Sequence, residues 1–484
     1  MNRKQFLKTL SAAAIAVAFA PALHAADAAD VLKRASTAMG GDDLKTLVYS
    51  GSGMGSSYGQ AYIPGMAWPK LNYSKYLRQV DYEKIFISEE VSRGRAEPKG
   101  GGAVPLSGEA PFSGSASATR AWQAAGGAPV WRQAAHSGRM HDLWITPHGV
   151  IKAAMKANAT AKEVTQGGRK LTAVSFTQPG IMVATAYIND SGMVERVESR
   201  IPDAVTGDTP VVTTYSDYRD HGGVKFPAKI EQKMAGSMTL DINIAEVKPN
   251  APVDASVPDN VASAVERVTS EKVADGVWFL AGGSHNSVAI EMKDHVILVE
   301  APLGDERTSA VFDTVYKLVP NKPVKYVVNS HNHFDHAGGL RAAAAEGATI
   351  ITQAQSKAYY DKVFANPNKI AIDRLARSGR KAKVEGVAEK RTLKDATRTV
   401  ELHQIKGSDH ADTILMAYLP SDKLLIEVDL YTPGAPNAPA PAQPNAYHLN
   451  LIENIEKLKL NVDRILPLHG RVVPYSELLR MVGR

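Results

Sequence analysis

The stretch VVNSHNHFDHAGGL, residues 327–340, begins in a β-branched run and ends just after a glycine pair. Within six positions it carries His331, His333, Asp335 and His336. A histidine in a protein core needs only one or two hydrogen-bond partners, so imidazoles this close together indicate a ligand that attracts them all. A divalent cation suits imidazole and carboxylate side chains. We therefore expect a metal-binding loop between a strand and a helix.

Two sets of ligands are expected from this one loop. His331 and His333 alternate with Asn332, so an extended backbone directs both rings to the same side. Asp335 and His336 follow and point elsewhere, which gives two ligand sets a short distance apart, as a two-metal hydrolytic site requires. Because the chain has no cysteine, imidazole and carboxylate must hold any metal.

Three further candidate ligands follow along the chain, each beside the end of a predicted strand. His410 lies in DHADTILMAYLP, Asp429 in KLLIEVDLYTP and His469 in DRILPLHGR. Ligand sites of α/β proteins assemble at the ends of the strands. We therefore expect these three residues to meet the loop at 331–336 in the folded chain.

This set of residues, in this order, closely resembles the metallo-β-lactamase-fold superfamily of metal-dependent hydrolases. The resemblance covers about residues 268–484 and implies an α/β domain with an αββα sandwich. It also implies two metal positions and their ligands: His331, His333 and His410 for the first, Asp335, His336 and His469 for the second, and Asp429 as the bridge. Members usually bind zinc, so two Zn²⁺ per chain are expected, and iron or manganese is also compatible with the carboxylates.

Two departures from the superfamily pattern bear on this expectation. Glu300 ends the strand in HVILVEAPLG, where many members have an aspartate, which leaves its role beside the metals open. No cysteine replaces Asp429, which separates this chain from β-lactamases that use a thiolate at the second metal. The loop SHNHFDHAGG is closer to those of lactonase-like members and broad hydrolases.

The expected chemistry is attack of a metal-bound hydroxide on an ester, lactone or amide carbonyl of a small acyl substrate. Metal binding lowers the pKa of water from about 15.7 to about 7, which makes hydroxide available at neutral pH. Asp335 is predicted to orient this nucleophile and to relay its proton to the leaving group. Tyr431 is predicted to donate a hydrogen bond to the developing oxyanion, because lactonase-like members have a tyrosine near this place.

Several alternatives remain open. Hydrolysis of a β-lactam is the second choice within the same class of enzyme. A single-iron dioxygenase built on the same fold would not need His336 and His469 as ligands. A third alternative is a non-catalytic protein that binds lipid or acyl ligands and keeps a vestigial metal site. The complete set of ligand residues argues against this last alternative.

The N-terminus is predicted to be an export signal. Residues 1–25 pass from basic residues through an apolar run of about ten residues to small residues, the layout of a secretory signal peptide. Cleavage after Ala25 and a periplasmic or secreted location are expected. The apolar run is too short to span a bilayer, so stable membrane insertion is not expected. A net charge of +6 over 484 residues does not favour nucleic acid as a partner.

Residues 26–260 are predicted to form a separate α+β domain with a curved antiparallel sheet. Residues 170–247 alternate polar and apolar side chains between turn signals, which is typical of an antiparallel meander. Its late hairpins resemble the half-barrel of exported lipoprotein-carrier-like proteins. Residues 93–128 are rich in Gly, Ala and Ser without any period, so they are predicted to be a flexible loop.

Overall fold

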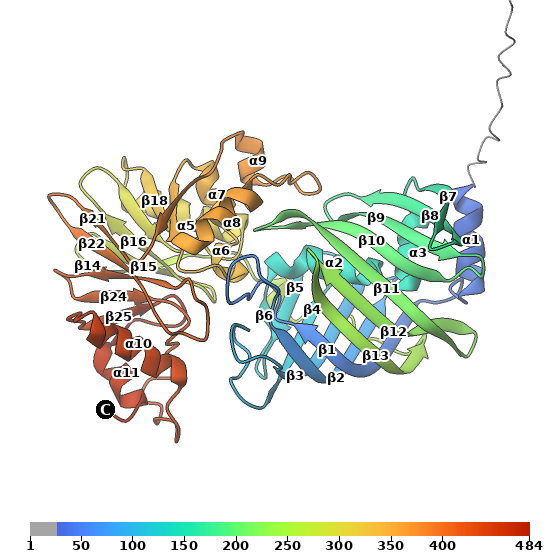
Figure 1. Cartoon of the computed structure of the whole chain (residues 1–484), viewed down its shortest axis with the longest axis horizontal. Coiled ribbons are helices and arrows are strands. Elements are labelled where there is room, and N and C mark those ends of the chain that lie inside the picture. The colour runs from blue at the N-terminus through green and yellow to red at the C-terminus, as the bar shows by residue number, and fades with distance from the viewer. Residues whose placement is uncertain (1–26) are drawn as a thin grey trace, which may run out of the picture.

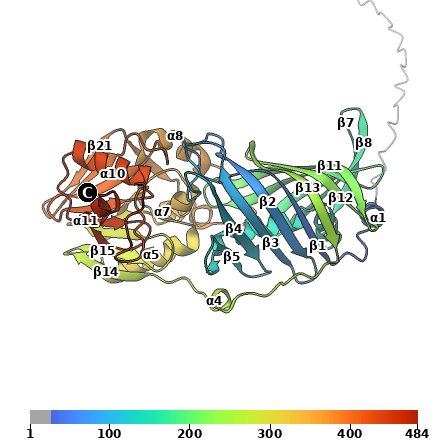
Figure 2. The same ribbon diagram turned by 90° about the horizontal axis from the view of Figure 1, so that it is seen from below.

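The computed structural model describes residues 27–484, and the predicted signal peptide lies outside these residues. Figure 1 shows two parts side by side, one built on a large antiparallel sheet and one a layered α/β domain. Figure 2 shows the connecting segment, which contains the short helix α4 (Asp259–Ala262), running along one side of the molecule. None of the helices within residues 27–484 has the length and apolar character needed to cross a membrane.

The N-terminal part is one thirteen-stranded sheet in the order β6-β5-β4-β3-β2-β1-β13-β12-β11-β10-β9-β8-β7. All neighbouring strands are antiparallel, so β8 to β13 form the predicted meander. The strands are β1 (Thr46–Ser56), β2 (Lys70–Asp81), β3 (Phe86–Arg95), β4 (Glu109–Ala116), β5 (Ala121–Ala124), β6 (Val130–Trp131), β7 (Thr160–Gln166), β8 (Arg169–Gln178), β9 (Met182–Asn189), β10 (Val194–Asp203), β11 (Gly207–His221), β12 (Val224–Met234) and β13 (Ser237–Pro249).

Helices bury their apolar sides against this sheet, whose curvature is visible in Figures 1 and 2. They are α1 (Ala28–Ala38), α2 (His136–Trp144) and α3 (Pro147–Met155), and the short 3₁₀ turn η1 (Gln133–Ala135) leads into α2. Leu32, Leu143 and Ile151 from the helices share one core with Tyr49 and Phe226 from the strands. The α+β class with a curved antiparallel sheet is therefore confirmed.

The prediction of one flexible loop over residues 93–128 is wrong in part, because β4 and β5 lie within it. Small residues are needed here because Arg139 of α2 packs closely against β4. Its Nη1 donates to the carbonyls of Ser115 (3.1 Å) and Trp122 (2.7 Å). A Cβ at Gly114 would lie 2.8 Å from the same guanidinium. Close packing against Arg139 therefore accounts for the glycine at position 114 in β4.

His148 of α3 gives the N-terminal part a pH-dependent stability. Its ring is 1% exposed and stacks on Phe226, and its Nε2 lies 3.1 Å from the Met39 carbonyl. Burial lowers the pKa of His148 to about 4, against about 6.5 in an unfolded chain. The unfolded state binds the extra proton, so stability falls as the pH falls from about 6.5 to about 4, by on the order of 3 kcal/mol.

Urea unfolding followed by tryptophan fluorescence at about pH 7 and about pH 4.5 measures this effect. Four of the five tryptophans lie before residue 150, so the signal reports mainly the N-terminal part. His148→Gln keeps a polar side chain without the titration, and we expect it to flatten the pH dependence. His221→Gln, at the end of β11, is the matched control and should keep it. An equal pH dependence in both variants would contradict the assignment.

The C-terminal part has a seven-stranded sheet in the order β14 to β20 and a six-stranded sheet in the order β21 to β26. The first sheet contains β14 (Thr269–Ala274), β15 (Val277–Ala281), β16 (Ser287–Glu291), β17 (Val296–Val299), β18 (Val324–Val328), β19 (Thr349–Gln353) and β20 (Lys383–Val387). The second contains β21 (Lys390–Lys394), β22 (Thr399–Gln404), β23 (Leu415–Leu419), β24 (Leu424–Glu427), β25 (Arg464–Pro467) and β26 (Val473–Pro474).

Two cores show that the sheets are stacked and covered by helices. Ile290 and Val328 of the first sheet share a core with Leu402 and Ile426 of the second. On its other face the first sheet packs against Phe312 of α5 and other helical residues. The helices are α5 (Asp305–Leu318), α6 (Phe334–Ala337), α7 (Leu340–Ala345), α8 (Ala354–Phe364), α9 (Arg374–Ser378), α10 (Ala446–Lys457) and α11 (Tyr475–Met481). This arrangement confirms the αββα sandwich.

Strand direction determines where the candidate ligands gather. Strands β17 to β20 are parallel, and so are β24 and β25. The stretch from His331 to His336 follows β18, Asp429 follows β24, and His469 follows β25. The segment with His410 enters β23 at the same edge, where the Leu415 amide donates to the Ser330 carbonyl (2.7 Å). Four chain segments therefore meet at one edge of the sandwich.

Candidate metal centre

The loop after β18 is fixed by its own side chains and by a close backbone approach. Asn329 Nδ2 donates to the His331 carbonyl (2.7 Å), which holds the backbone of the first candidate ligand. A Cβ at Gly339 would lie 1.7 Å from Oγ1 of Thr308 in α5. Only glycine therefore allows this loop to pack directly on α5 before α7 begins.

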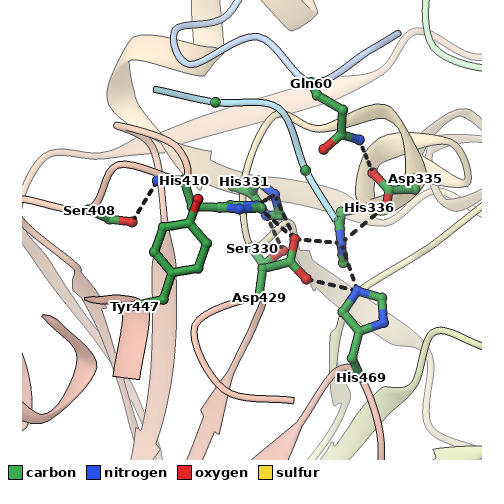
Figure 3. A network of polar contacts seen from close by, with 12 residues as sticks. Gln60, Ser330, His331, Asp335, His336, Ser408, His410, Asp429, Tyr447 and His469 are labelled. Carbon is green, nitrogen blue, oxygen red and sulfur yellow. Dashed lines mark hydrogen bonds and ion pairs between the residues drawn. The ribbon is translucent and has the colours of Figure 1, made fainter. Parts of the chain in front are cut away.

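The first group brings together four of the predicted ligands. One ligand atom from each lies within 4.8 Å of all the others, and the group consists of His331, His333, His410 and Asp429. The histidine rings are almost fully buried. Nε2 of His331 and Nε2 of His410 face each other at 3.2 Å, and Figure 3 shows both rings directed at the Asp429 carboxylate.

The donor set of this group fits a metal ion. His333 is 0% exposed, and neither of its ring nitrogens has a hydrogen-bond partner within residues 27–484. A buried imidazole without any partner is unfavourable unless a cation occupies the space before it. Three imidazoles and one carboxylate in a cysteine-free chain are the ligand types that zinc accepts.

The second group contains the other three predicted ligands and one more. Its ligand atoms also lie within 4.8 Å of one another, and its members are His285, Asp335, His336 and His469. Nε2 of His336 lies 3.3 Å from Nε2 of His469. Nε2 of His285 lies 3.2 Å from Oδ2 of Asp335. The structure therefore places every predicted ligand in one of two adjacent groups.

Asp429 lies between the two groups. Its Oδ2 is 2.8 Å from His410 Nε2 of the first group, and its Oδ1 is 2.8 Å from His469 Nε2 of the second, so the carboxylate contacts both groups. Oδ2 also lies 3.2 Å from His336 Nε2. The backbone at Asp429 has a φ of 58°, a left-handed conformation that is strained for a residue with a side chain. Strain of this kind is kept where surrounding contacts require one side-chain direction.

The histidines and carboxylates of the centre stabilise each other's charged forms. Burial alone lowers the pKa of His336, but the carboxylates of Asp429 and Asp335 outweigh it and hold this pKa well above its usual range. Burial raises the pKa of Asp429, yet His336 and His469 hold it well below its usual range. Burial lowers the pKa of His331 to about 3. The centre thus favours ionised carboxylates and a positive charge beside them, the charge that a bound metal supplies.

Glu300, whose role the sequence left open, lies directly behind the second group. It is 0% exposed, and its Oε2 accepts a hydrogen bond from Ser330 Oγ and lies 3.2 Å from His336 Nδ1. A carboxylate behind a ligating histidine fixes the tautomer and the direction of the ring. Glu300 therefore leaves Nε2 of His336 to face the candidate metal position.

Tyr431, predicted to stabilise an oxyanion, is turned away from both groups. Its hydroxyl donates to Glu477 Oε1 (3.3 Å), and its ring packs on His448. Tyr447 lies nearer to the groups, with its ring centroid 5.6 Å from that of His410 in the arrangement of Figure 3. The catalytic role of Tyr431 stays a prediction that its contacts do not support.

Three residues beside the centre were not predicted to be metal ligands. The sequence places His285, after Gly282-Gly283, in a loop beside the site, as a contact to a ligand residue or to substrate. Tyr447 lies at the start of α10, without a spacing relation to the ligands. Gln60 comes from the N-terminal part, and its Nε2 donates to Asp335 Oδ1 (2.8 Å). Only the folded arrangement of the two parts brings Gln60 there.

Known proteins resemble the C-terminal part of this chain. Residues 280–367 match the metallo-beta-lactamase superfamily. A linear primary-alkylsulfatase from Pseudomonas sp is 30% identical over 95 residues, which cover 19% of this chain and 13% of that protein. An (R)-specific secondary-alkylsulfatase from Pseudomonas sp is 28% identical over 196 residues, which cover 32% of this chain and 28% of that protein. The chain thus matches under a third of these relatives' length, and the predicted superfamily of metal-dependent hydrolases is confirmed for this region.

Solved structures of metallo-beta-lactamases also resemble part of this chain. A metallo-beta-lactamase from Pontibacter korlensis is 20% identical and covers 45% of this chain and 98% of its own, with a TM-score of 0.33. The mono-zinc form of the metallo-beta-lactamase FIM-1 from Pseudomonas aeruginosa is 17% identical and covers 45% and 94%, with a TM-score of 0.34. These likenesses concern less than half of the chain.

Proposed function

We propose that this chain, with its metallo-beta-lactamase superfamily region at residues 280–367, is a hydrolase with two zinc ions that cleaves an ester or lactone. The observation that carries the proposal is the position of Asp429, whose carboxylate contacts His410 of one ligand group and both His336 and His469 of the other. A non-catalytic binding protein would not need a shared carboxylate and two complete groups. The same observation argues against a single-iron dioxygenase.

The side chains have distinct parts in this reaction. When bound, a pair of zinc ions supplies an activated water and Lewis acids that stabilise negative charge on the substrate. Asp429 fixes the separation of the two groups, and Glu300 directs His336. The side chain of Asp335 is 36% exposed, so it faces the space from which substrate arrives. Its pKa is held well below the usual range, because His336 and a hydrogen bond from His285 outweigh burial.

That low pKa suits a metal ligand. A proton carrier works best with a pKa near the operating pH, so the predicted proton relay through Asp335 is not supported by its surroundings. In this proposal Asp335 orients the nucleophile and binds the second metal. Protonation of the leaving group falls to solvent or to a side chain of the rim.

A sulfate ester is the second candidate substrate, favoured by the two alkylsulfatase relatives. Arg132 of the N-terminal part adds a positive charge that interacts with Asp335. Burial lowers the pKa of the Arg132 guanidinium, and the carboxylate of Asp335 is the main charge that opposes this shift. A positive side chain at this place suits a substrate with an anionic group beside the bond that breaks.

Turnover of a substrate panel by the zinc-loaded full chain tests the proposal. The panel contains 4-nitrophenyl butyrate, an acyl lactone, dodecyl sulfate with sulfate release as readout, and nitrocefin for the β-lactam alternative. We expect hydrolysis of the ester or lactone, and sulfate release would establish the second candidate. Hydrolysis of nitrocefin alone would favour the β-lactamase alternative. No hydrolysis by a protein with two zinc ions per chain would overturn the proposed activity.

We further propose that the protein is exported to the periplasm or secreted. The proposal rests on the basic, apolar and small-residue order of residues 1–25. N-terminal sequencing of the protein recovered outside the cytoplasm should begin near Ala26. A mature chain that begins at Met1 would contradict cleavage.

A further inference from the structure

A loop of the N-terminal part lies directly on the candidate metal centre. This rim loop comprises residues 57–69, between β1 and β2. The carbonyl of Gly59 accepts from the Phe334 amide (3.1 Å), and the carbonyl of Ala61 accepts from Asn332 Nδ2 (2.8 Å). Both hydrogen bonds hold the loop that carries His331 to His336. The rim loop is therefore tied to the backbone of the candidate ligands.

The same loop also reaches the segment with His410. The carbonyl of Tyr62 accepts from the Asp412 amide (3.0 Å), and the Tyr62 hydroxyl donates to the Ser408 carbonyl (3.1 Å). A second N-terminal loop adds the Gly100 amide, which donates to the Asp409 carbonyl (2.7 Å). The N-terminal part thus holds two ligand-bearing segments in one relative position.

Packing against the Phe334 ring also restrains the rim loop. Tyr58 and Trp68 both meet the ring of Phe334 edge to face, at centroid distances of 5.5 and 6.0 Å. Gly59 has a φ of 72°, and a Cβ there would lie 2.6 Å from the Phe334 ring. Phe334 immediately precedes Asp335, so this contact fixes the backbone from which the Asp335 side chain extends.

Gln60 is the one side chain of the rim loop that hydrogen-bonds a candidate metal ligand, among the described residues. Its Nε2 donates to Oδ1 of Asp335 at 2.8 Å, as Figure 3 shows. Gly102 packs against the other side of the Gln60 amide, and a Cβ at Gly102 would lie 2.3 Å from Gln60 Oε1. With Oδ1 occupied by Gln60, Oδ2 of Asp335 is turned toward His285 (3.2 Å) and His336 (3.7 Å).

We propose that Gln60 is a positioning residue that directs Oδ2 of Asp335 at the second metal, so that the N-terminal part completes the metal centre. The inference rests on the two-metal centre of the proposed function and is independent of the substrate. A partner that hydrogen-bonds a metal ligand restricts its direction before the metal arrives. Loss of such a partner typically weakens metal binding about 10- to 100-fold.

Zinc affinity of the full chain tests this role without any measurement of turnover. Metal-free protein is titrated with zinc in competition with a chromophoric chelator, for wild type, Gln60→Ala and Gln60→Met. Methionine keeps the length of the side chain and removes the donor. Gln123→Ala, in β5 of the same domain, is the matched control. We expect one of the two zinc ions to bind about 10- to 100-fold more weakly in both Gln60 variants. The other ion and the control should be unchanged.

The melting temperature of each metal-free variant separates positioning from folding. We expect all variants to melt within about 2 °C of wild type, because a single partly buried hydrogen bond contributes little to the global stability of a chain of this length. Wild-type affinity in Gln60→Met would overturn the donor role, and so would equal weakening of both ions with a lower melting temperature. One zinc ion per wild-type chain would overturn both proposals. Two ions with unchanged affinities in the Gln60 variants would overturn only this one.

Discussion

Replacement of His333 by alanine is expected to lower kcat/KM for the best panel substrate by more than about 100-fold. This loss exceeds the one that follows removal of a residue that only hydrogen-bonds a metal ligand. Both ring nitrogens of His333 are buried and lack a partner, so a metal ion is the ligand that its position requires. The variant should also retain one zinc ion fewer than wild type. Because His333 lies outside the N-terminal core, the circular dichroism of the folded chain should be unchanged.

Activity assays and metal analysis of the same preparation measure both effects. His221→Ala is the matched control, since His221 lies at the far end of β11 and in neither ligand group. A His333→Ala protein that keeps two zinc ions and most of its activity would contradict the assignment. Loss of the native circular dichroism spectrum would instead show that the variant failed to fold.

The second large effect is expected at Asp429. Asn at this position keeps the size of the side chain and tolerates the left-handed backbone at φ 58°. Its neutral amide, however, lacks the negative charge and the second oxygen with which the carboxylate contacts both groups. We expect Asp429→Asn to hold one zinc ion or none and to lose more than about 100-fold in kcat/KM.

Zinc content after dialysis against a zinc-buffered solution measures this directly. The comparison with His469→Ala is informative, because that change removes a ligand of one group only. We expect Asp429→Asn to lose more zinc than His469→Ala at every buffered concentration. Equal zinc content in the two variants would show that Asp429 serves a single metal.

The metal centre could be predicted from the sequence because its ligands lie beside strand ends. The loop at 331–339 is determined mainly by its own sequence. It follows a short strand rich in β-branched residues, and it consists of a His-rich turn and a glycine pair. His410, Asp429 and His469 then follow, because the ends of β24 and β25 and the start of β23 lie at one edge. The hydrophobic pattern locates these strand ends, and the resemblance to the superfamily assigns the residues there to two metal positions.

Other features could not be predicted because they depend on contacts between distant segments. Most strands of the N-terminal sheet lie between Gln60 and Asp335 in the sequence. The contact of Gln60 with Asp335 therefore depends on how the two parts dock. Residues 93–128 were predicted as a loop because small residues mask the strand pattern of β4 and β5. At Gly114 the reason for the small residue is Arg139, which lies later in the sequence and packs against it.

The metal content of the wild-type chain tests the central claim most directly. Purified full-length protein is saturated with zinc, freed of excess metal at about pH 7.5, and analysed for metal and protein in the same sample. At this pH the ligand imidazoles are available for zinc, whereas at low pH protons compete for them. The two groups joined by Asp429 predict two zinc ions per chain. One ion per chain at saturation, or none, would contradict the account.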